Sequence, residues 1–380
     1  MIFFKSPFWR SVGIISGLVG AGLFALPYSV NVSGIFWSLV NVALAFFAVL
    51  SIHLVYGEVV TNTKSFHRVP GYIKIYLGEF FGKLAKVTSL SGINAIILVY
   101  AILAGIFLSH IFGGSQFVWS LVFLVSNSIV LFLSRAKDIG FLNIILMIPL
   151  LLTILFISFL SAKNGSLSNI SFFGSDPFFS FGVFVFALSG MSSIADSREV
   201  FLNQSNLDAA KGLRSSTILG TTLPLILYIV FILGVLMASG ATTTEDALSG
   251  LSGILGNKIL VLGAVMGFLA IFRAALTLSY DLQEIYELDL VEGKKFSWVL
   301  AGILPIFLFL IIPKDFVKII SIVGGVLIAI DGILVVFILR KMRHTGQSFI
   351  QFLNFGKTHQ IALIAIFVLS IIYEFVYQIF

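Results

Sequence analysis

Long apolar stretches alternate with short polar links along the whole chain, and most stretches are about twenty residues long or longer. A helix rises about 1.5 Å per residue, so about twenty residues cross the roughly 30 Å hydrocarbon core of a bilayer. The strands of a membrane barrel would instead form segments of about ten residues with alternating hydrophobicity. The pattern therefore predicts an all-α integral membrane protein with about eleven transmembrane helices.

The expected helices form two sets of five, followed by one further helix. Because five is odd, the second set crosses the membrane in the opposite sense to the first, as in inverted repeats. We expect a single transmembrane domain over 1–380, with a first repeat at 8–162, an inverted repeat at 177–339 and an additional helix at 360–380. The expected helices cover 8–33, 34–61, 87–112, 115–134, 139–162, 177–202, 215–239, 258–288, 296–312, 316–339 and 360–380.

Composition agrees with this pattern and excludes some chemistry. Of the 380 residues, 59% are hydrophobic and 11% charged, which is more apolar surface than a soluble core can hide. The first apolar run follows Lys5 and Arg10, as in a signal peptide, but it is too long for one and similar runs follow. We expect it to be the first helix. The absence of cysteine excludes disulfides and thiolate metal sites.

The distribution of Lys and Arg predicts the orientation. If the N-terminus is cytoplasmic, 18 of the 23 Lys and Arg residues fall in cytoplasmic links and four in outer links, while Arg273 lies within a helix. Cytoplasmic loops of membrane proteins carry such an excess of Lys and Arg over the outer loops. We expect a multi-pass protein of the cell membrane with its N-terminus inside and its C-terminus outside. Topology thus explains the net charge of +6 without a nucleic-acid partner.

Two links are expected to have structure of their own. Residues 240–257 form the longest polar outer loop, a possible lid. Residues 70–86 are expected to form one helix on the cytoplasmic interface, because lysines surround an apolar face. That face holds Ile73, Tyr76, Leu77, Phe80 and Leu84.

The first helix of each repeat carries signs of a break near its middle. In the first, Gly20 and Gly22 permit non-helical dihedral angles, and Pro27 removes a backbone donor near residue 23. In the helix expected at 177–202, small and polar residues interrupt the apolar run. They are Ser189, Gly190, Ser192 and Ser193. Unpaired backbone groups at this depth are tolerated where they line a cavity or bind something.

Paired breaks create a site with two opposite ends. Free amides and the positive dipole end at the start of the outer half-helix, near Gly22, suit a carboxylate. Carbonyl groups that end the neighbouring half-helices, at residues 16–19 and 186–189, suit an ammonium group or a cation. A cavity with an anion end and a cation end matches a zwitterion. The sequence therefore indicates an amino acid as the substrate.

Two motifs resemble a known family. The run Gly20-Ala21-Gly22-Leu23-Phe24-Ala25-Leu26-Pro27 resembles the first-helix signature of the amino acid–polyamine–organocation superfamily, and Phe186-Ala187-Leu188-Ser189-Gly190 resembles its sixth-helix element. Eleven helices with a Pro-Gly-Tyr segment after the second are most similar to the amino acid/auxin permease or aromatic amino acid permease branch. The resemblance implies the leucine-transporter fold, alternating access, and symport with sodium or protons. Many relatives carry glutamate where this chain has Ser192, so no proton role is carried over to that position.

The substrate is expected at the two breaks. Backbone amides of the first break would bind the carboxylate, the Tyr100 hydroxyl could reach it, and residues of the second break would line the side-chain pocket. Small residues there favour a modest neutral side chain. The candidate substrate-binding residues are Gly20, Ala21, Gly22, Leu23, Tyr100, Phe186, Ser189, Gly190 and Met191.

The coupling ion is expected to be Na⁺ or H⁺, with no other cofactor. The family's sodium site uses first-helix carbonyls and eighth-helix groups, and this resemblance implies a possible Na⁺ site at Ser16, Val19, Ala274 and Thr277. Oxygen ligands suit sodium. Leu278 stands where a second hydroxyl is often found.

Charged residues within helices are costly and therefore informative. Arg273 and Asp331 are expected at similar depth, so they would face one another, or Asp331 would carry a coupling proton. In the alternative interpretation Arg273 reaches the inner interface and Asp331 bonds to backbone broken at Gly324-Gly325. Glu58 and Asp196 are expected near the inner surface, in contact with water.

Other classes fit the sequence less well. His53 and His110 lie at different depths and cannot share a haem, and no catalytic or metal-binding motif stands at one membrane face, so an enzyme is not expected. A channel, a non-transporting receptor, or a transporter of polyamines or other small solutes remain as alternatives. The prediction is a secondary active transporter of amino acids.

Overall fold

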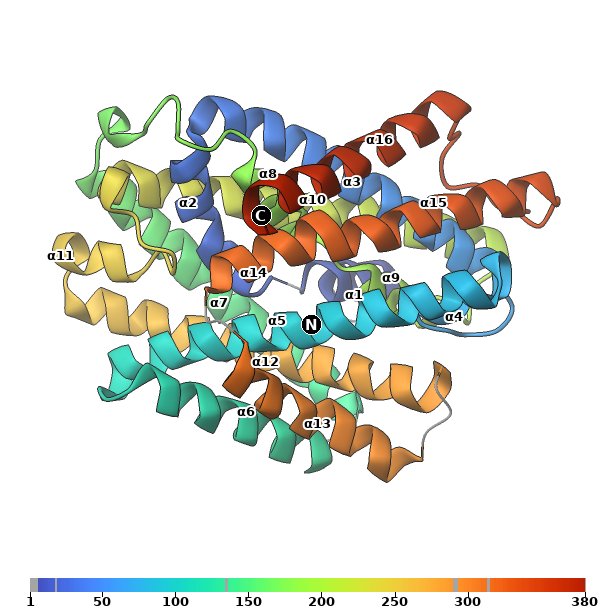
Figure 1. Ribbon diagram of the computed structural model, residues 1–380, viewed down its shortest axis with the longest axis horizontal. Helices are drawn as coiled ribbons and strands as arrows, with labels where there is room; N and C mark the ends of the chain where they lie inside the picture. The colour runs from blue at the N-terminus through green and yellow to red at the C-terminus, as the bar shows by residue number, and fades with distance from the viewer. Residues whose placement is uncertain (1–5, 18, 134–135, 290–292, 313–314, 380) are drawn as a thin grey trace.

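The computed structural model describes residues 6–17, 19–133, 136–289, 293–312 and 315–379, with the backbone alone at 136–147, 288–289 and 378–379. The regular structure of these residues is helical. Figure 1 shows most helices side by side along the long axis, with α4 (Val69–Leu77) at one end and α11 (Ser252–Leu255) at the other. These ends are called the α4 end and the α11 end below.

In chain order the helices divide into a first half, which ends at Asn164, and a second half. The first half contains α1 (Pro7–Ser16), α2 (Ala21–Ser33), α3 (Ile35–Asn62), α4, α5 (Glu79–Phe112), α6 (Gln116–Leu133) and α7 (Ala136–Asn164). The second contains α8 (Phe179–Leu188), α9 (Met191–Glu199), α10 (Asn206–Ser239), α12 (Asn257–Glu284), α13 (Lys294–Ile311), α14 (Phe316–Ile322) and α15 (Ala329–His344), and α16 (Lys357–Glu374) follows. Short 3-10 turns η2, η3 and η4 cover Leu167–Asn169, Gly240–Thr242 and Ser249–Leu251. Three π-helical turns, η5, η6 and η7, cover Ile285–Asp289, Val323–Ile328 and Phe375–Ile379.

Each predicted transmembrane segment coincides with a helix or with a pair of half-helices. Among the described residues, nine helices are long and apolar enough to cross a membrane, and α1 with α2 adds a tenth when the bent pair is taken as one span. The 29-residue α7 occupies the position of the predicted fifth helix. The prediction of an all-α membrane fold is confirmed.

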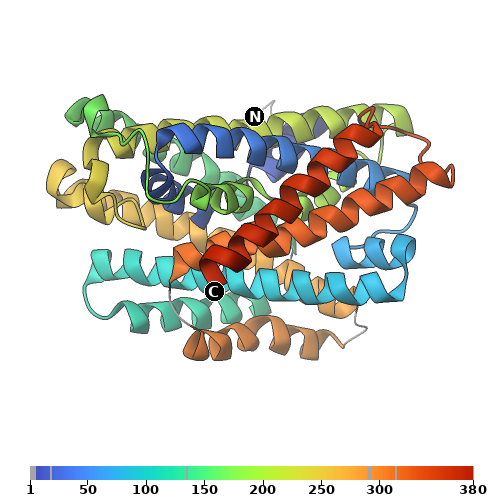
Figure 2. The ribbon, with the colours of Figure 1, turned by 45° about the horizontal axis from the view of Figure 1, so that its top comes forward.

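The half-helices lie at the centre of the bundle. α2 packs on α8, and α8 packs in turn on α3 and on the π-helix η6, which joins α14 to α15. α5 packs along α12, and α1 along α10. Figure 2 shows α16 crossing α15 obliquely at the outside of the bundle. The breaks are therefore enclosed by continuous helices.

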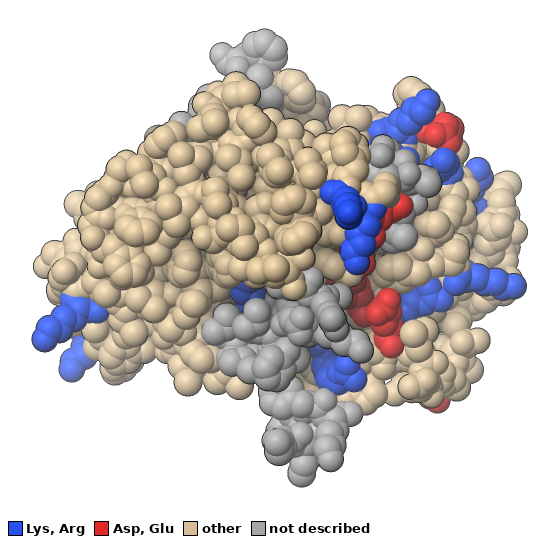
Figure 3. Space-filling model, turned by 90° about the horizontal axis from the view of Figure 1, so that it is seen from below, with Lys and Arg blue, Asp and Glu red and all other residues tan. Residues whose placement is uncertain are grey.

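Large apolar side chains cover the outer surface. Phe132 and Leu133 on α6 are 64% and 72% exposed, and Phe307 and Ile311 on α13 are 59% and 79% exposed. Figure 3 shows one lateral face on which uncharged residues form a broad area, while most of the visible charged residues lie in one half of the view and a few basic residues lie at the opposite end. Such a surface is stable in lipid rather than in water.

The segment at 70–86 differs from the prediction of one interfacial helix. α4 ends at Leu77, Gly78 takes φ +92°, and α5 begins at Glu79. A positive φ is easily adopted by glycine and ends the helix there. Ile73 is buried within the protein while Phe80 is 75% exposed. The single-helix prediction is wrong because Gly78 reverses the chain, so that α4 packs against α5 and α15.

The polar link at 240–257 is folded onto the bundle. Asp246 accepts hydrogen bonds from the Thr244 and Ser249 side chains, at 2.6 Å each. Leu248 and Leu251 are buried in the main core. A role of this link as a lid remains a prediction.

Candidate functional site

The first predicted break lies between α1 and α2, whose axes differ by 53°. Gly20 has φ −138° and ψ −141°, outside the helical region, and α2 begins at the next residue. Leu23 N–H donates to the Gly20 carbonyl at 3.3 Å, whereas the first amides of a helix have no partner within it. The prediction of an interrupted first helix is confirmed. The amide of Leu23 is already engaged, so the candidate donors for a carboxylate are those of Ala21 and Gly22.

The second predicted break lies between α8 and α9. Ser189 is extended and Gly190 leads into α9 at Met191. The Ser189 hydroxyl donates to the Phe186 carbonyl at 2.8 Å, and the Ser193 hydroxyl donates to the Gly190 carbonyl at 2.6 Å. The serines therefore satisfy part of the backbone that the break leaves open.

The two breaks meet where glycine allows close approach. A β-carbon on Gly22 would lie 2.6 Å from that of Ala187 on α8, and one on Gly20 would lie 2.6 Å from the Tyr100 hydroxyl on α5. Glycine at these two positions lets α2, α5 and α8 converge. The structure thus brings three segments, far apart in sequence, to one point.

A cavity extends from the breaks toward the α4 end. Its empty space, counted together with the part open to solvent, is about 1040 Å³. Of the nine candidate substrate-binding residues, seven line it, whereas Ala21 and Leu23 have fully buried side chains. The seven are Gly20, Gly22, Tyr100, Phe186, Ser189, Gly190 and Met191.

Arg273 is joined to the first break. It is 3% exposed, and its Nη2 donates to the Val19 carbonyl at 3.2 Å. A β-carbon on Gly17 would lie 3.4 Å from Arg273 Nη1, so the guanidinium fills the space beside the end of α1. The guanidinium thus satisfies a carbonyl that the interrupted helix leaves open.

The four candidate sodium ligands are distributed around this contact. The Ser16 hydroxyl donates to the Val12 carbonyl at 2.7 Å, and the Thr277 hydroxyl donates to the Arg273 carbonyl at 3.2 Å. Ala274 is buried on α12. Among the described residues no group of three or more His, Cys, Asp or Glu side chains could hold a metal ion.

Asp331 lies at another part of the cavity. Its carboxylate accepts hydrogen bonds from Thr88 at 2.5 Å and from Ser89 at 3.2 Å, both on α5. The prediction that it faces Arg273 is wrong, and so is the alternative pairing with backbone at Gly324-Gly325. Similar depth in the membrane does not fix the direction in which each helix turns its side chains.

An arginine and three carboxyl groups gather at the α4 end of the cavity, and the sequence did not indicate this cluster. Arg68, in the link between α3 and α4, donates to Asp196 at 2.9 Å, to Glu284, and lies 3.2 Å from Asp281. Burial opposes the charged form of Arg68, but the three carboxylates outweigh it and raise its pKa. Arg68 and Asp281 both line the cavity. Asp196 is therefore part of an ion-pair cluster.

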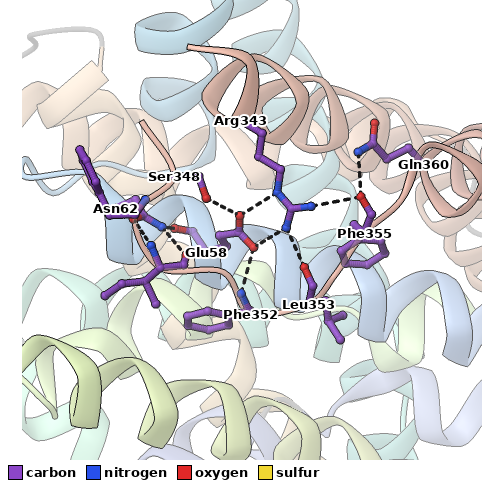
Figure 4. A network of polar contacts seen from close by, with 10 residues as sticks. Glu58, Asn62, Arg343, Ser348, Phe352, Leu353, Phe355 and Gln360 are labelled. Atoms are coloured by element: carbon purple, nitrogen blue, oxygen red, sulfur yellow. Dashed lines mark hydrogen bonds and ion pairs between the residues drawn. The ribbon is translucent and has the colours of Figure 1, made fainter. Parts of the chain in front are cut away.

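Glu58 is also buried, contrary to expectation. It is 0% exposed and accepts hydrogen bonds from Arg343 on α15 at 3.0 and 3.1 Å. Figure 4 shows the same carboxylate bonded to Ser348 and to the backbone N–H of Phe352, in the link that leads to α16. Four hydrogen bonds compensate for its burial.

Comparison with known proteins identifies the fold and the family. Residues 5–374 match the sequence model of the Tryptophan/tyrosine permease family. The chain belongs to this family. Among curated protein sequences, none matches the chain. As a member of this family it is a secondary amino acid transporter, which confirms the predicted class of function and sets aside a channel or a non-transporting receptor.

A solved transporter structure shares the architecture of this permease. The crystal structure of MhsT in complex with L-phenylalanine has a TM-score of 0.71 against it, with 15% identity over 97% of this chain and 96% of that one. At this identity the likeness establishes the fold. The predicted leucine-transporter-like architecture with broken first and sixth helices is confirmed.

Proposed function

We propose that this permease transports aromatic amino acids, tryptophan and tyrosine first among them. The observation that carries the proposal is the cavity at the two helix breaks. The family is described as tryptophan/tyrosine permeases, and the similar MhsT crystal contains L-phenylalanine. Apolar side chains continue the cavity beyond the breaks and could accept a ring. They include Ile93, Ile96, Phe186 and Leu327.

Each part of the substrate has a candidate partner. The carboxylate would bind the amides of Ala21 and Gly22, with the Tyr100 hydroxyl beside them, because these amides begin a helix. The ammonium group would lie against carbonyl groups that end α8, at the negative end of that half-helix. An aromatic side chain would lie along Phe186. This substrate is larger than the modest side chain that the serine and glycine residues favoured.

The coupling ion is proposed to be a proton, carried by Asp331. Arg273 already places a positive charge on the Val19 carbonyl, which supports a proton over sodium, since the two cations would repel one another there. Asp331 lines the cavity and has hydroxyl partners, so it could exchange a proton while substrate is bound. Ionisable groups within a membrane commonly mark such pathways.

The orientation is proposed to place the α4 end and the N-terminus in the cytoplasm and the C-terminus outside, in the cell membrane. Positive charge in the links at the α4 end supports it. The cavity described here would then open toward the cytoplasm, with Arg68 and its carboxylates across its mouth.

Uptake by the reconstituted protein tests these proposals. Labelled tryptophan, tyrosine, phenylalanine, small neutral amino acids and a polyamine are offered under a proton gradient and, separately, under a sodium gradient. Concentrative uptake of the aromatic amino acids under the proton gradient alone is expected. Uptake driven only by sodium would overturn the coupling proposal, and preferential uptake of a small amino acid or a polyamine would overturn the substrate proposal.

A further inference from the structure

The eleventh membrane helix brings a carboxyl group into the interior of the protein. Glu374, at the end of α16, is 0% exposed. Its Oε1 accepts a hydrogen bond from the Ser321 hydroxyl at 2.6 Å, whereas Oε2 is buried without a hydrogen-bond partner. Glu374 forms no ion pair with any residue that the structure describes.

Glycines on two other helices make room for this side chain. A β-carbon on Gly182 of α8 would lie 2.8 Å from Glu374 Oε1, and one on Gly325 of η6 would lie 2.6 Å from Glu374 Cγ. A β-carbon on Gly324 would collide with the Gly182 carbonyl oxygen. Glu374 is therefore inserted at the point where α8 and the π-helix cross most closely.

A second residue of α16 contacts the same π-helix. The Ser370 hydroxyl donates to the Gly325 carbonyl at 2.9 Å. A π-helix departs from the regular i→i−4 hydrogen-bond pattern, and such turns are frequent at functional sites. Helix α16 thus contacts η6 through the neutral side chain of Ser370 and through the ionisable side chain of Glu374.

The charged groups nearest to Glu374 are one acid and one lysine, and neither forms an ion pair with it in the part of the chain that the structure describes. α8 and η6 contain no ionisable residue. Asp176, before α8, and Lys318 on α14 are close enough to act on Glu374 through space. The Tyr373 hydroxyl beside it donates to both oxygens of Asp176 at 2.6 Å, and Tyr377 is 70% exposed.

We infer that Glu374 is a proton-binding site through which α16 controls the contact between α8 and η6. A buried carboxylate with one hydrogen bond and no cation is costly, so the closed contact holds the carboxylic acid, with its proton on Oε2. Loss of that proton to water places a negative charge between two close-packed helices. Hydration of this charge requires the helices to separate.

The consequence reaches the substrate cavity through α8. Gly182 and Phe186 are one helical turn apart on α8, and Phe186 lines the cavity. Separation of α8 from η6 therefore moves a wall of the substrate site. The inference rests on transport by the two-break architecture and does not depend on which ion drives it.

Infrared difference spectroscopy of the reconstituted protein tests the protonation directly. Raising the pH should remove a carbonyl band of a protonated carboxylic acid, and that change should be absent from Glu374→Gln. Glutamine keeps the size of the side chain and its hydrogen bond to Ser321, but it does not titrate. An unchanged band in the variant would overturn the inference.

Thiol labelling tests the movement without an uptake assay. The chain has no cysteine, so Ser180→Cys on α8 introduces a single reporter at a position that is 0% exposed. The labelling rate is measured in Ser180→Cys alone and in Ser180→Cys combined with Glu374→Gln. The ratio of the first rate to the second should rise several-fold from acid to alkaline buffer. The same thiol is present in both proteins, so its own dependence on pH cancels in this ratio. A ratio independent of pH would also overturn the inference.

Two further variants control this experiment. Ser370→Ala removes the neutral contact of α16 with η6, so labelling should increase while its dependence on pH persists. If Glu374→Gln does not fold, Ser321→Ala takes its place, because it removes the donor to Oε1 and should shift the pH at which labelling rises. The same midpoint in both backgrounds would show that Glu374 is not the titrating group.

Discussion

Arg273 and Val19 connect α12 to the end of α1 through one hydrogen bond of 3.2 Å from the guanidinium Nη2 to the main-chain carbonyl oxygen. The carbonyl is available because the first helix is interrupted there. The guanidinium is buried, so this hydrogen bond takes the place of hydrogen bonds that the guanidinium and the carbonyl would otherwise make to water. A fixed positive charge at the break therefore belongs to the architecture of the site.

Substitution of Arg273 should uncouple α12 from the break. Arg273→Met keeps an apolar side chain of similar length but leaves the Val19 carbonyl without its donor, at a cost of about 1–3 kcal/mol. Uptake should fall by at least about tenfold, and Arg273→Lys, which retains a donor and a charge, should recover part of it. Full uptake by Arg273→Met would contradict this role. Thermal unfolding in detergent measures the accompanying loss of stability.

Gly22 and Gly13 offer a matched comparison within the interrupted first helix. Gly22→Ala places a β-carbon 2.6 Å from that of Ala187, so about 1–3 kcal/mol of strain and loss of uptake are expected. A β-carbon on Gly13 meets nothing within 4 Å, so Gly13→Ala should be neutral or more stable by roughly 0.5–1 kcal/mol. Similar effects of the two changes would show that close packing of the breaks is unimportant.

Tyr100 is expected to contribute to substrate affinity. Tyr100→Phe removes a hydroxyl beside Gly20 without changing the ring, so the Michaelis constant for uptake should rise roughly tenfold, or about 1.5 kcal/mol. Tyr228→Phe is the control, since the Tyr228 hydroxyl donates to the Ala187 carbonyl at 2.9 Å. That change should lower thermal stability with a smaller effect on the Michaelis constant. Equal effects on affinity would argue against a direct role for Tyr100.

The cluster around Arg68 should determine access from the α4 end. Arg68→Ala leaves three carboxylates facing one another and should cost about 3 kcal/mol of stability, because removal of one member of a buried ion pair is strongly destabilising. Labelling of a cysteine introduced at Ser89 in the cavity should become faster. Lys74→Ala breaks an exposed ion pair with Glu79 at 3.1 Å and serves as the control, with no change expected in either measurement.

The stability of the folded protein should depend on pH through Glu245, which lies in the link at the α11 end. Burial, Asp315 and Asp246 raise its pKa, so the folded state favours the neutral acid. The associated stability is present below the unfolded pKa and is lost as the pH rises through the raised folded pKa. Glu245→Gln should therefore match the wild type in acid and exceed its melting temperature at neutral pH. A constant difference at all pH values would contradict this assignment.

The positions of the breaks could be predicted because their causes are local. Gly20 and Gly190 interrupt apolar runs that otherwise read as helices, and such an interruption can be recognised without knowing the neighbours. The same holds for helix lengths, which the thickness of the bilayer determines. Gly78 shows the limit of this approach, because its positive φ was hidden within an amphipathic pattern that continued through it.

The partners of the charged residues could not be predicted in this way. The predicted depth in the membrane correctly placed Arg273 and Asp331 within the bundle. The rotation of each helix about its own axis, however, determines which residues a side chain contacts. Arg68 was counted as one basic residue among many in a cytoplasmic link. Its role depends on Asp281, 213 positions later, and the packing of α4 against η5, the turn that continues α12, brings them together.

The hydrogen bonds of Glu58 limit which parts of the protein can move separately. They join α3 to α15 and to the link before α16, so the two helices and the link cannot part at the α4 end without leaving a carboxylate unpaired. Any movement that opens the α4 end while these bonds persist must therefore carry α3, α15 and this link together.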